Sequence, residues 1–435
     1  MMTPEENDLL CRVEGAAPMG QLMRAHWVPA LLSEQVAEPD GAPVRVRVLG
    51  QNMVAFRDSD GRLGVLDELC PHRRASLVYG RNEECGLRCL YHGWKLDVNG
   101  KVVDMPSEPP GSALPEKIRH RSYPVHEVGG FVWVYLGSED QVPEFQRPPF
   151  APDADTPVSI LKMNIPCNWA QIVEGQIDSA HSSSLHSSDM VPARVDSAAA
   201  TDTSWLRPST DKAPRMQAQR TSFGFRYAAI RRPIKQADIN DYVRVTVFVA
   251  PYISLIPPNT SYNVAAVIVP VDDVNTAFHF IAWGGEDCID QDSWRKFNHA
   301  EVGVDVDENY NCLRTLENNF KQDRARMKAG NFTGIEGIPN QDIAMWVSMG
   351  AIADRSRDVL GASDMAIVEF RKLMLDAARQ VQAGGAAIGT TEPRIPQSKI
   401  ASYQGIVPKS TDWRVLGAAE EELQAAQEDT RQNAV

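Results

Sequence analysis

The chain has 435 residues, enough for two or three domains, and its 43% hydrophobic and 23% charged residues are ordinary proportions for a globular protein. Its formal net charge of −13 argues against nucleic acid and anionic membrane surfaces as partners, although a local pair of arginines can still bind an anionic substrate. No signal peptide and no apolar run near the ~20 residues of a membrane span are visible, so we expect a cytoplasmic protein with no membrane partner.

The first part of the chain alternates apolar and polar residues in short runs. Residues 44–48 and 130–135 have this pattern, and turns separate such runs. The pattern predicts a small antiparallel β domain over residues 27–150. We expect the preceding segment, 1–26, to pack on the body of the protein. Proline and charge are dense over residues 143–157, which indicates a linker.

Two compact Cys-His pairs lie inside this β unit. Cys70 and His72 form the first pair, and Cys89 and His92 follow after sixteen residues. A [2Fe-2S] cluster with two thiolates on one iron and two imidazoles on the other needs these ligands. Zinc is the alternative, but zinc fingers usually group Cys with Cys and His with His. We therefore predict a Rieske cluster, held by loops at the tips of two antiparallel hairpins. Such a cluster relays electrons to chemistry elsewhere.

The other five cysteines indicate no disulfide framework. They are scattered along the chain at Cys11, Cys85, Cys167, Cys288 and Cys312. Because their number is odd and their spacing irregular, we expect free thiols in a reducing compartment.

The second part of the chain mixes strand and helix patterns. From residue 158 a short alternating stretch leads into a helix-like segment that runs to about residue 186. Four alternating stretches then predict a sheet, over 221–230, 242–249, 259–271 and 276–283. The clearest helical period lies at 363–381, and the Ala/Glu/Gln-rich tail, 416–435, is a candidate surface helix. The fold class predicted is α+β, with an N-terminal antiparallel β domain and a C-terminal domain that has an antiparallel sheet flanked by helices.

A second candidate metal site lies at the end of that helix-like segment. Asp178 and His181 are three residues apart, so a helix would place them on one face. His181 and His186 would diverge by about 140° on a straight helix, so the helix must end or bulge between them, and three consecutive serines favour such an ending. Two histidines and a distant carboxylate suit a non-heme iron that activates O2. A polar helix end with two surface histidines is the alternative, but the electrons of the cluster need a destination.

Together these motifs resemble the α-subunit of a Rieske non-heme iron aromatic-ring oxygenase. The resemblance covers about residues 27–375, and residues 354–367 are similar to the phthalate dioxygenase branch, whose α-subunits form trimers or stacked trimers. It rests on the motifs Cys70-Pro71-His72-Arg73-Arg74, Cys89-Leu90-Tyr91-His92-Gly93-Trp94, Asn168-Trp169 and the segment Asp178 to His186.

The resemblance implies two metal centres in two domains. A Rieske [2Fe-2S] domain would span 27–150, with Cys70 and Cys89 on one iron and His72 and His92 on the other. A catalytic domain over 158–415 would hold mononuclear Fe²⁺ through His181 and His186. Asp178 would link His181 of one subunit to His92 of the next, so that a homotrimer or stacked hexamer is needed for activity. A flavin and iron-sulfur reductase would supply electrons from NADH.

The carboxylate ligand of the iron has four candidates in the C-terminal half, Asp342, Asp354, Asp358 and Asp364. Asp342 is flanked by large apolar residues, and its position upstream of the last helix matches that of the ligand in the family. Asp354 and Asp358 alternate with arginines, and Asp364 has a ready role at a helix start. We therefore predict Asp342. One departure is that some relatives carry an asparagine near the iron where this chain has Glu174 or Gly175.

An aromatic dicarboxylate such as phthalate needs paired cations, and arginine matches a carboxylate with two hydrogen bonds. Arg244 lies on the strand face that carries Tyr242 and Thr246, and Arg207 follows the metal segment, so we predict both as substrate-binding residues. A surface strand with an exposed arginine is the alternative. Three further arginines are weaker candidates, Arg220, Arg231 and Arg232.

The expected activity is cis-dihydroxylation of phthalate or a close aromatic carboxylate with O2. A Rieske monooxygenase or O-demethylase acting on a substituted or phenoxy benzoate would carry the same metals, because pocket shape sets the choice. A pure electron carrier would need only about the first 150 residues, so the second histidine pair argues against that class.

Overall fold

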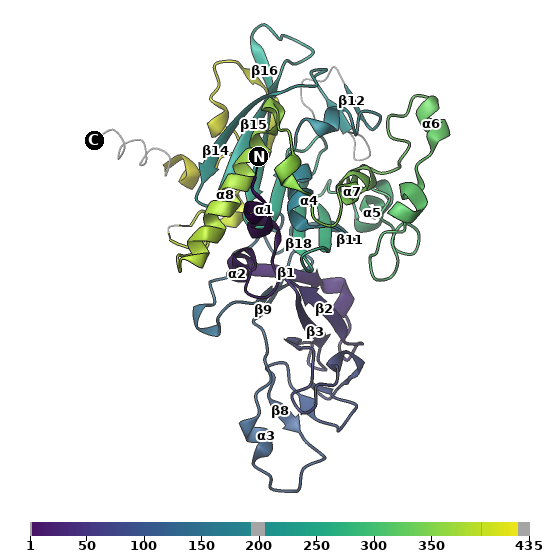
Figure 1. Cartoon of the computed structure of the whole chain (residues 1–435), viewed down its shortest axis with the longest axis vertical. Helices are drawn as coiled ribbons and strands as arrows, with labels where there is room; N and C mark the ends of the chain where they lie inside the picture. Colours follow the sequence, from purple (N-terminus) through teal and green to yellow (C-terminus); the bar gives the residue numbers. More distant parts are fainter. Residues whose placement is uncertain (1, 193–204, 393, 425–435) are drawn as a thin grey trace, which may run out of the picture. The chain divides into compact units, whose positions relative to one another are not determined.

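The structure, a computed structural model, describes residues 2–192, 205–392 and 394–424. The chain divides into two compact units (Figure 1). We call residues 13–16 and 23–145 the cluster unit, and residues 1–12, 17–22 and 146–435, as far as they are described, the sheet unit. The helices are α1 (Pro4–Cys11), α2 (Pro18–Arg24), α3 (Leu114–Lys117), α4 (Trp169–Gln176), α5 (Gln291–Phe297), α6 (Arg324–Lys328), α7 (Ile338–Ser348) and α8 (Met365–Gln382).

The cluster unit is an antiparallel β domain, as predicted. Its sheets have the strand orders β1-β10-β9, β2-β3-β4 and β5-β6-β7-β8. Their strands are β1 (Trp27–Leu32), β2 (Val44–Val48), β3 (Gln51–Arg57), β4 (Leu63–Asp67), β5 (Arg81–Glu83), β6 (Gly86–Arg88), β7 (Lys95–Leu96), β8 (Val102–Asp104), β9 (Val125–Val128) and β10 (Phe131–Tyr135). One apolar cluster, which includes Phe56, Leu66, Leu87 and Leu96, packs directly around Cys70 and Cys89. The two cysteines predicted as cluster ligands are therefore anchored in the core of this unit.

The sheet unit contains the predicted antiparallel sheet. The strand order is β11-β19-β18-β17-β16-β15-β14, and β20 also pairs with β16. These strands are β11 (Val158–Ile165), β14 (Arg215–Thr221), β15 (Gly224–Arg231), β16 (Asn240–Val249), β17 (Ile253–Ile256), β18 (Asn263–Pro270), β19 (Thr276–Trp283) and β20 (Tyr403–Pro408). Two short strands, β12 (Met190–Pro192) and β13 (Trp205–Arg207), pair in parallel beside it.

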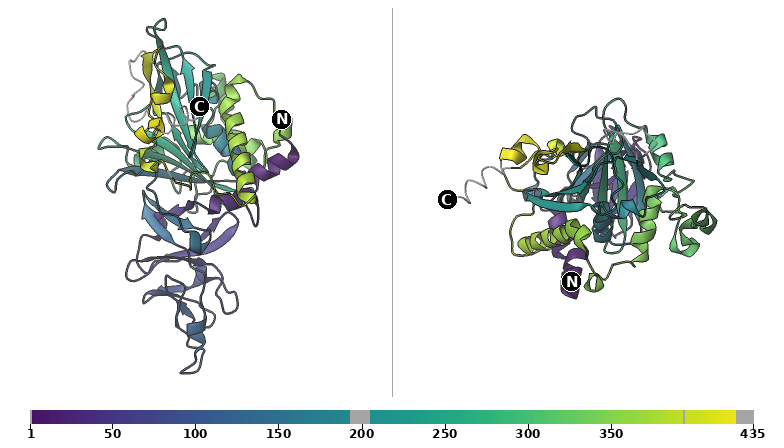
Figure 2. Two further views of the ribbon diagram at one scale, coloured as in Figure 1. Left: turned by 90° about the vertical axis from the view of Figure 1, so that its left-hand side faces the viewer. Right: turned by 90° about the horizontal axis from the view of Figure 1, so that it is seen from above.

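Helices flank the large sheet, and Figure 2 shows them from two further directions. Helix α4 packs against β17 and β18, α8 against β14 and β15, and α5 against β11. The ring of Phe370 in α8 meets Trp169 of α4 at 5.8 Å and Phe248 of β16 at 5.3 Å, both edge to face. Such aromatic pairs stabilise a core beyond the area that they bury. The sheet, α4 and α8 therefore share one core.

The N-terminal helix α1 packs against α4 and α8. Thr3 and Glu6 form a capping box at its start. The guanidinium of Arg355 donates hydrogen bonds to the side chains of Asn7 and Cys11, each at 3.1 Å. Because Arg355 is fully buried, these contacts hold α1 against the far end of the chain.

The helix-like segment predicted up to residue 186 is shorter than expected. Helix α4 ends at Gln176, and a 3-10 turn, His181–Ser183, follows after a break. The carboxylate of Asp178 accepts a 2.7 Å hydrogen bond from the N–H of Ala180, and the hydroxyl of Ser182 donates to the carbonyl of Ser179 at 3.1 Å. Such local bonds replace helical ones. The prediction that one helix carries Asp178 and His181 was therefore wrong.

Residues 420–424 of the predicted tail helix are helical, while residues 425–435 lie outside the described part. None of the described helices is both long and apolar enough to cross a membrane.

Candidate metal centres and anion pocket

The two Cys-His loops of the cluster unit have the same backbone construction. In the first, the N–H of Cys70 donates to the carbonyl of Ala75 at 2.8 Å and its carbonyl accepts from Arg74 at 3.0 Å. In the second, the N–H of Cys89 donates to the carbonyl of Trp94 at 2.8 Å and its carbonyl accepts from Gly93 at 3.0 Å. Each loop thus reverses tightly after its cysteine.

The reversal needs a left-handed residue in each loop. Arg74 has a φ of 61° and Gly93 a φ of 77°. At the second position a glycine is required for another reason, because a Cβ on Gly93 would lie 2.6 Å from Cγ of Pro106. The first loop follows β4, and the second lies between β6 and β7. Both loops therefore lie next to strand ends.

The two loops bring their histidines together. The ring centroids of His72 and His92 are 4.3 Å apart, and Trp94 stacks on His72 at 4.5 Å with an angle of 6° between the planes. The side chains of Cys70 and Cys89 are almost fully buried. Burial, and then the neighbouring Cys89, raise the pKa of the Cys70 thiol to about 11.

These residues suit a metal cluster. Nδ1 of His72 is buried, and among the described residues it has no hydrogen-bond partner. A buried polar atom without a partner is costly, and a bound metal ion would satisfy it. The raised pKa of Cys70 disfavours its isolated thiolate, and metal binding stabilises a thiolate. The donor set therefore fits the [2Fe-2S] cluster that the sequence predicts.

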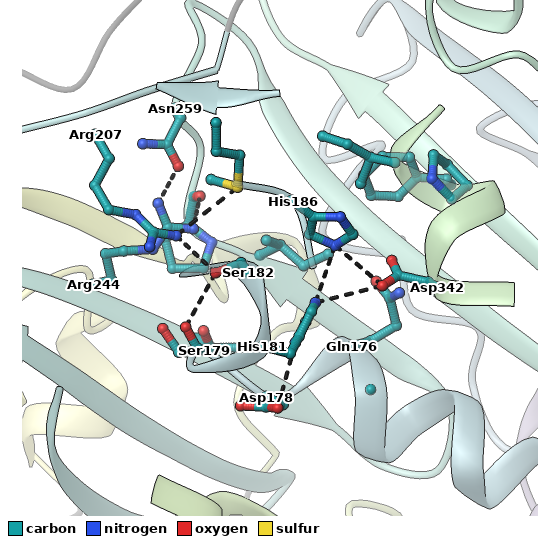
Figure 3. Close-up of a pocket in the computed structure, with 18 of the residues that line it drawn as sticks. Gln176, Asp178, Ser179, His181, Ser182, His186, Arg207, Arg244, Asn259 and Asp342 are labelled. Carbon is teal, nitrogen blue, oxygen red and sulfur yellow. Dashed lines mark hydrogen bonds and ion pairs between the residues drawn. The ribbon is translucent and has the colours of Figure 1, made fainter. Parts of the chain in front are cut away.

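The sheet unit brings His181, His186 and Asp342 together, with their ligand atoms within 4.8 Å of one another. Nε2 of His181 lies 3.1 Å from Nε2 of His186. The Oδ1 atom of Asp342 lies 3.5 Å from the first nitrogen and 3.1 Å from the second. Both histidines come from the segment after α4, and Asp342 comes from α7 (Figure 3). Two imidazole nitrogens and one carboxylate that face one point fit a mononuclear iron.

The other three aspartates that the sequence offered are engaged elsewhere. Asp354 caps the turn at Ser356, Asp358 pairs with Arg371 at 2.6 Å, and Asp364 accepts from the N–H of Gly361 at 2.6 Å. Asp342, in contrast, is 6% exposed and points into the pocket.

Asp178 lies beside the histidine pair, on the side away from Asp342. Its Oδ2 is 3.5 Å from Nδ1 of His181. Burial alone raises the pKa of Asp178, but the hydrogen bond and charge of His181 outweigh burial, and the net pKa is lowered. Asp178 is therefore held as a carboxylate against the ring of His181.

Sequence reasoning missed Gln341. Its Oε1 lies 2.7 Å from Nδ1 of His186, and its Nε2 donates at 2.9 Å both to Asp189 and to the carbonyl of Ile335. Because both amide protons are used, the amide oxygen accepts from His186, which leaves Nε2 of the ring as the free donor of electrons to a metal. No sequence pattern marks this residue, since the bond joins positions 155 residues apart.

The structure shows what Glu174 and Gly175 contact in place of the asparagine of some relatives. Glu174 accepts from Arg355 at 2.8 Å and from Arg371 at 2.7 Å, so it belongs to a buried charge cluster. A Cβ on Gly175 would lie 2.1 Å from Nε1 of Trp346, so an asparagine would not fit there without a shift. The next residue, Gln176, lines the pocket, and its amide points toward Asp342 (Figure 3).

Arg207 and Arg244 line the same pocket as the metal triad. Both are 6% exposed, which rules out the surface-strand alternative for Arg244. Arg244 donates to the carbonyl of Pro257 at 2.8 Å and to the amide oxygen of Asn259. Arg207 donates to the hydroxyls of Ser183 and Ser182 at 3.0 and 2.8 Å. Within the described part of the chain, the partners of both guanidiniums are uncharged groups and not carboxylates.

A third buried arginine, Arg231, donates to the carbonyl of Ser179 at 2.8 Å. Burial, and then the charges of Arg244 and Arg231, lower the pKa of Arg207 to about 9. Burial, and then the charge of Arg244, lower the pKa of Arg231 to about 10. Two mutually repelling cations, Arg207 and Arg244, line one cavity, and the charge of Arg231 acts on both, which makes a strong site for an anion. The remaining candidates are surface residues, since Arg220 pairs with Glu369 and Arg232 pairs with Asp211.

The sequence matches two known domain families. Residues 26–125 match the Rieske [2Fe-2S] domain, and residues 134–434 match the LigXa C-terminal domain like family. Over 415 residues the chain is 63% identical to the phthalate 4,5-dioxygenase oxygenase subunit of Pseudomonas putida, covering 95% of this chain and 94% of that one. It is 35% identical to the 3-chlorobenzoate-3,4-dioxygenase oxygenase subunit of Comamonas testosteroni, covering 95% and 97%.

Solved structures with the same fold include dicamba monooxygenase bound to dicamba, with a TM-score of 0.58 and 16% identity over 83% of this chain and 98% of that one. A second is the oxygenase and ferredoxin complex of carbazole 1,9a-dioxygenase, with a TM-score of 0.55 and 23% identity over 86% and 95%.

Proposed function

We propose a function on the premise that the chain belongs to the Rieske oxygenase family, as its Rieske domain and its 63% identity to a known oxygenase subunit show. It is an aromatic-ring dioxygenase subunit with a [2Fe-2S] cluster and a mononuclear iron. We propose Cys70, His72, Cys89 and His92 as the cluster ligands and His181, His186 and Asp342 as the iron ligands. When bound, the cluster passes single electrons and the iron activates O2.

The proposed substrate is phthalate, and the proposed product its 4,5-cis-dihydrodiol. The observation that carries this proposal is the pair Arg207 and Arg244, two buried guanidiniums that line the pocket of the metal triad. A dicarboxylate gives each cation a charged partner, whereas a benzoate leaves one cation buried and unpaired, which is costly. The relative at 63% identity acts on phthalate, as its name states.

The residues around the ring would orient it and exclude water. Phe278, Phe280 and Ile256 line the apolar part of the pocket. With the carboxylates fixed by the arginines at one end, an aromatic ring would lie against these side chains, and its far edge would face the triad. Fixing the ring in this way lowers the entropic barrier to reaction at one edge.

Electron delivery would depend on Asp178 and on assembly. We propose that the carboxylate of Asp178 connects Nδ1 of its own His181 to His92 of a neighbouring subunit in a trimer or stacked hexamer. An NADH-dependent flavin and iron-sulfur reductase would donate electrons to the cluster. A structural relative is known in complex with a ferredoxin, which supports an electron-transfer protein as partner.

A substrate panel tests the proposed reaction. The purified subunit, supplied with NADH and a phthalate dioxygenase reductase, should consume O2 on addition of phthalate and yield the cis-dihydrodiol. Terephthalate, benzoate, 3-chlorobenzoate and phenoxybenzoate serve as comparison substrates. Coupled turnover of one of these in preference to phthalate, or a dealkylated or singly hydroxylated product, would replace the proposal with the monooxygenase alternative.

A further inference from the structure

The serines between the two iron-binding histidines are held by a substrate-binding arginine. Nη1 of Arg207 donates to Oγ of Ser183 at 3.0 Å, and Nη2 donates to Oγ of Ser182 at 2.8 Å. These serines follow His181 directly and precede His186 by a few residues. Arg207 thus contacts the short segment whose shape sets the spacing of both histidines (Figure 3).

The hydrogen-bond chain continues past Ser182. Its hydroxyl donates to the carbonyl of Ser179 at 3.1 Å, and the same carbonyl accepts from Arg231 at 2.8 Å. Ser179 is the neighbour of Asp178 in the sequence. A continuous path therefore runs from the anion pocket to the residue beside the proposed electron bridge.

The two serine bonds occupy the end of the Arg207 guanidinium and not its side edge. Nη1 and Nη2 form the end of the guanidinium, while Nε and Nη2 form its side edge, and either edge can bind a carboxylate with two parallel bonds. The end carries the serine contacts. Nε is buried, and no hydrogen-bond partner for it exists among the residues that the structure describes. The serines thus fix the plane of the guanidinium. On its side edge Nε has no partner among the described residues, and Nη2 makes a 3.9 Å contact with Sδ of Met190, a weak acceptor that a carboxylate would replace.

We propose that Ser182 and Ser183 are positioning residues that couple the anion pocket to the iron site. They orient Arg207 for a substrate carboxylate. When the carboxylate binds Arg207, the hydrogen bonds of Arg207 to the two serines shift the segment between His181 and His186. Substrate arrival is thereby transmitted to the spacing of the metal ligands. The inference rests on the proposed function, since it takes phthalate as the anion.

Thermodynamic reciprocity makes the coupling measurable without turnover. If phthalate alters the affinity for Fe²⁺ by some factor, Fe²⁺ alters the affinity for phthalate by the same factor, on the order of 5 to 150 for typical couplings. The test is anaerobic equilibrium dialysis of Fe²⁺ against protein with an intact cluster and an emptied mononuclear site, with and without saturating phthalate. A separate titration gives the Kd for phthalate in each metal state.

The double variant Ser182→Ala, Ser183→Ala should bind phthalate at least about fivefold more weakly, because Arg207 is no longer oriented, and its coupling factor should fall toward one. Ser184→Ala is the matched control, since Ser184 belongs to the same serine run but is exposed and makes no contact with Arg207. The single variant Ser182→Thr keeps a hydroxyl that can accept from Arg207, so it should retain most of the coupling between phthalate and Fe²⁺.

The outcomes separate this inference from the proposed function. If the double variant keeps the wild-type coupling factor, or binds phthalate more tightly, the positioning role is overturned while phthalate remains the substrate. If wild-type protein does not bind phthalate, the proposed function itself fails. Because the serines and the cluster ligands belong to different compact units, far-UV circular dichroism and the thermal unfolding midpoint check the folding of every variant. Where the double variant does not fold, the two single variants are compared with Ser184→Ala instead.

Discussion

Gln341 accepts a 2.7 Å hydrogen bond from Nδ1 of His186, and it does so from the position next to Asp342 in helix α7. One helix therefore supplies both a proposed iron ligand and the residue that orients a second ligand. Gln341 is in turn fixed by Asp189 and by the carbonyl of Ile335, both at 2.9 Å. The ring of His186 has little freedom to rotate or to change tautomer.

Replacing this amide should weaken the iron site. In Gln341→Met the Nδ1–H of His186 loses its acceptor, and loss of such a partner typically lowers metal affinity about 10- to 100-fold. Equilibrium dialysis of Fe²⁺ measures the change, and Gln380→Met, the same exchange on the exposed face of α8, is the control. Unchanged affinity in Gln341→Met would remove Gln341 from the metal site.

Removing Arg244 should discriminate between charged and uncharged aromatic ligands. A hydrogen bond to a charged group contributes about 1.5–3 kcal/mol, so Arg244→Met should raise the Kd for phthalate roughly 10- to 150-fold. Dimethyl phthalate, which carries no charge, should be affected far less. Arg220→Met, which breaks a surface pair with Glu369, is the control. Equal losses for both ligands would mean that Arg244 does not bind the anion.

Asp178→Asn should separate metal binding from electron supply. The substitution keeps the size of the side chain and removes the charge that faces Nδ1 of His181 at 3.5 Å. Iron analysis should still give about three irons per chain. Stopped-flow oxidation of the reduced cluster by O2, with phthalate present, should become much slower. Wild-type rates in this variant would exclude Asp178 from the electron path.

Gly175→Ala should disturb the iron site through the packing of α4 against α7. The new methyl would lie 2.1 Å from Nε1 of Trp346 in α7, the helix that carries Asp342. Overpacking of this kind costs about 1–3 kcal/mol, and relief requires α7 or α4 to shift. We expect reduced mononuclear iron content with an unchanged cluster spectrum. Gly285→Ala, where nothing lies within 4 Å of the new methyl, should retain full iron content.

Acid should destabilise the sheet unit through His279. Burial, and then the charge of Lys162, lower the pKa of His279 from 6.5 to about 3. Below pH 6.5 the unfolded chain therefore binds a proton that the folded chain does not, and stability falls as pH decreases toward 3. Each pH unit costs about 1.4 kcal/mol for one such group. Urea unfolding at each pH gives the difference in free energy of unfolding between wild type and His279→Gln. This difference should decrease by about 2 kcal/mol from pH 6.5 to 5. If the free energies of unfolding of the two proteins change equally with pH, His279 is not the source of the acid sensitivity.

The sequence predicts the fold and the ligand motifs well where the interacting residues are close together in the chain. The Cys70 and Cys89 loops and the strands of both units depend on short-range patterns. The segment from Asp178 to His186 was harder, because local hydrogen bonds of Asp178 and Ser182 override its helical pattern. The ligand and site assignments themselves stay predictions until metals are measured.

Long-range hydrogen bonds account for what could not be predicted. The contact of Gln341 with His186 spans 155 residues and follows from tertiary packing alone. Arg231 ranked low as a site residue because an arginine within a strand has no distinguishing pattern, yet it is buried beside Ser179. The serine run was noted as a helix breaker, whereas its contact with Arg207 becomes visible only when β13 lies beside it.

The anchoring of helix α1 by Arg355 has a consequence for the order of synthesis. Asn7 bonds to Ala353 and Arg355 across separations of 346 and 348 residues. On the ribosome, α1 emerges before residues 23–145 but completes these contacts only after Ala353 and Arg355 are made, whereas residues 23–145 are contiguous and can fold as soon as they are exposed. Limited proteolysis of stalled nascent chains should find the β domain protected long before α1. A cell could therefore load the iron-sulfur cluster into a chain whose oxygen-activating half is still being translated.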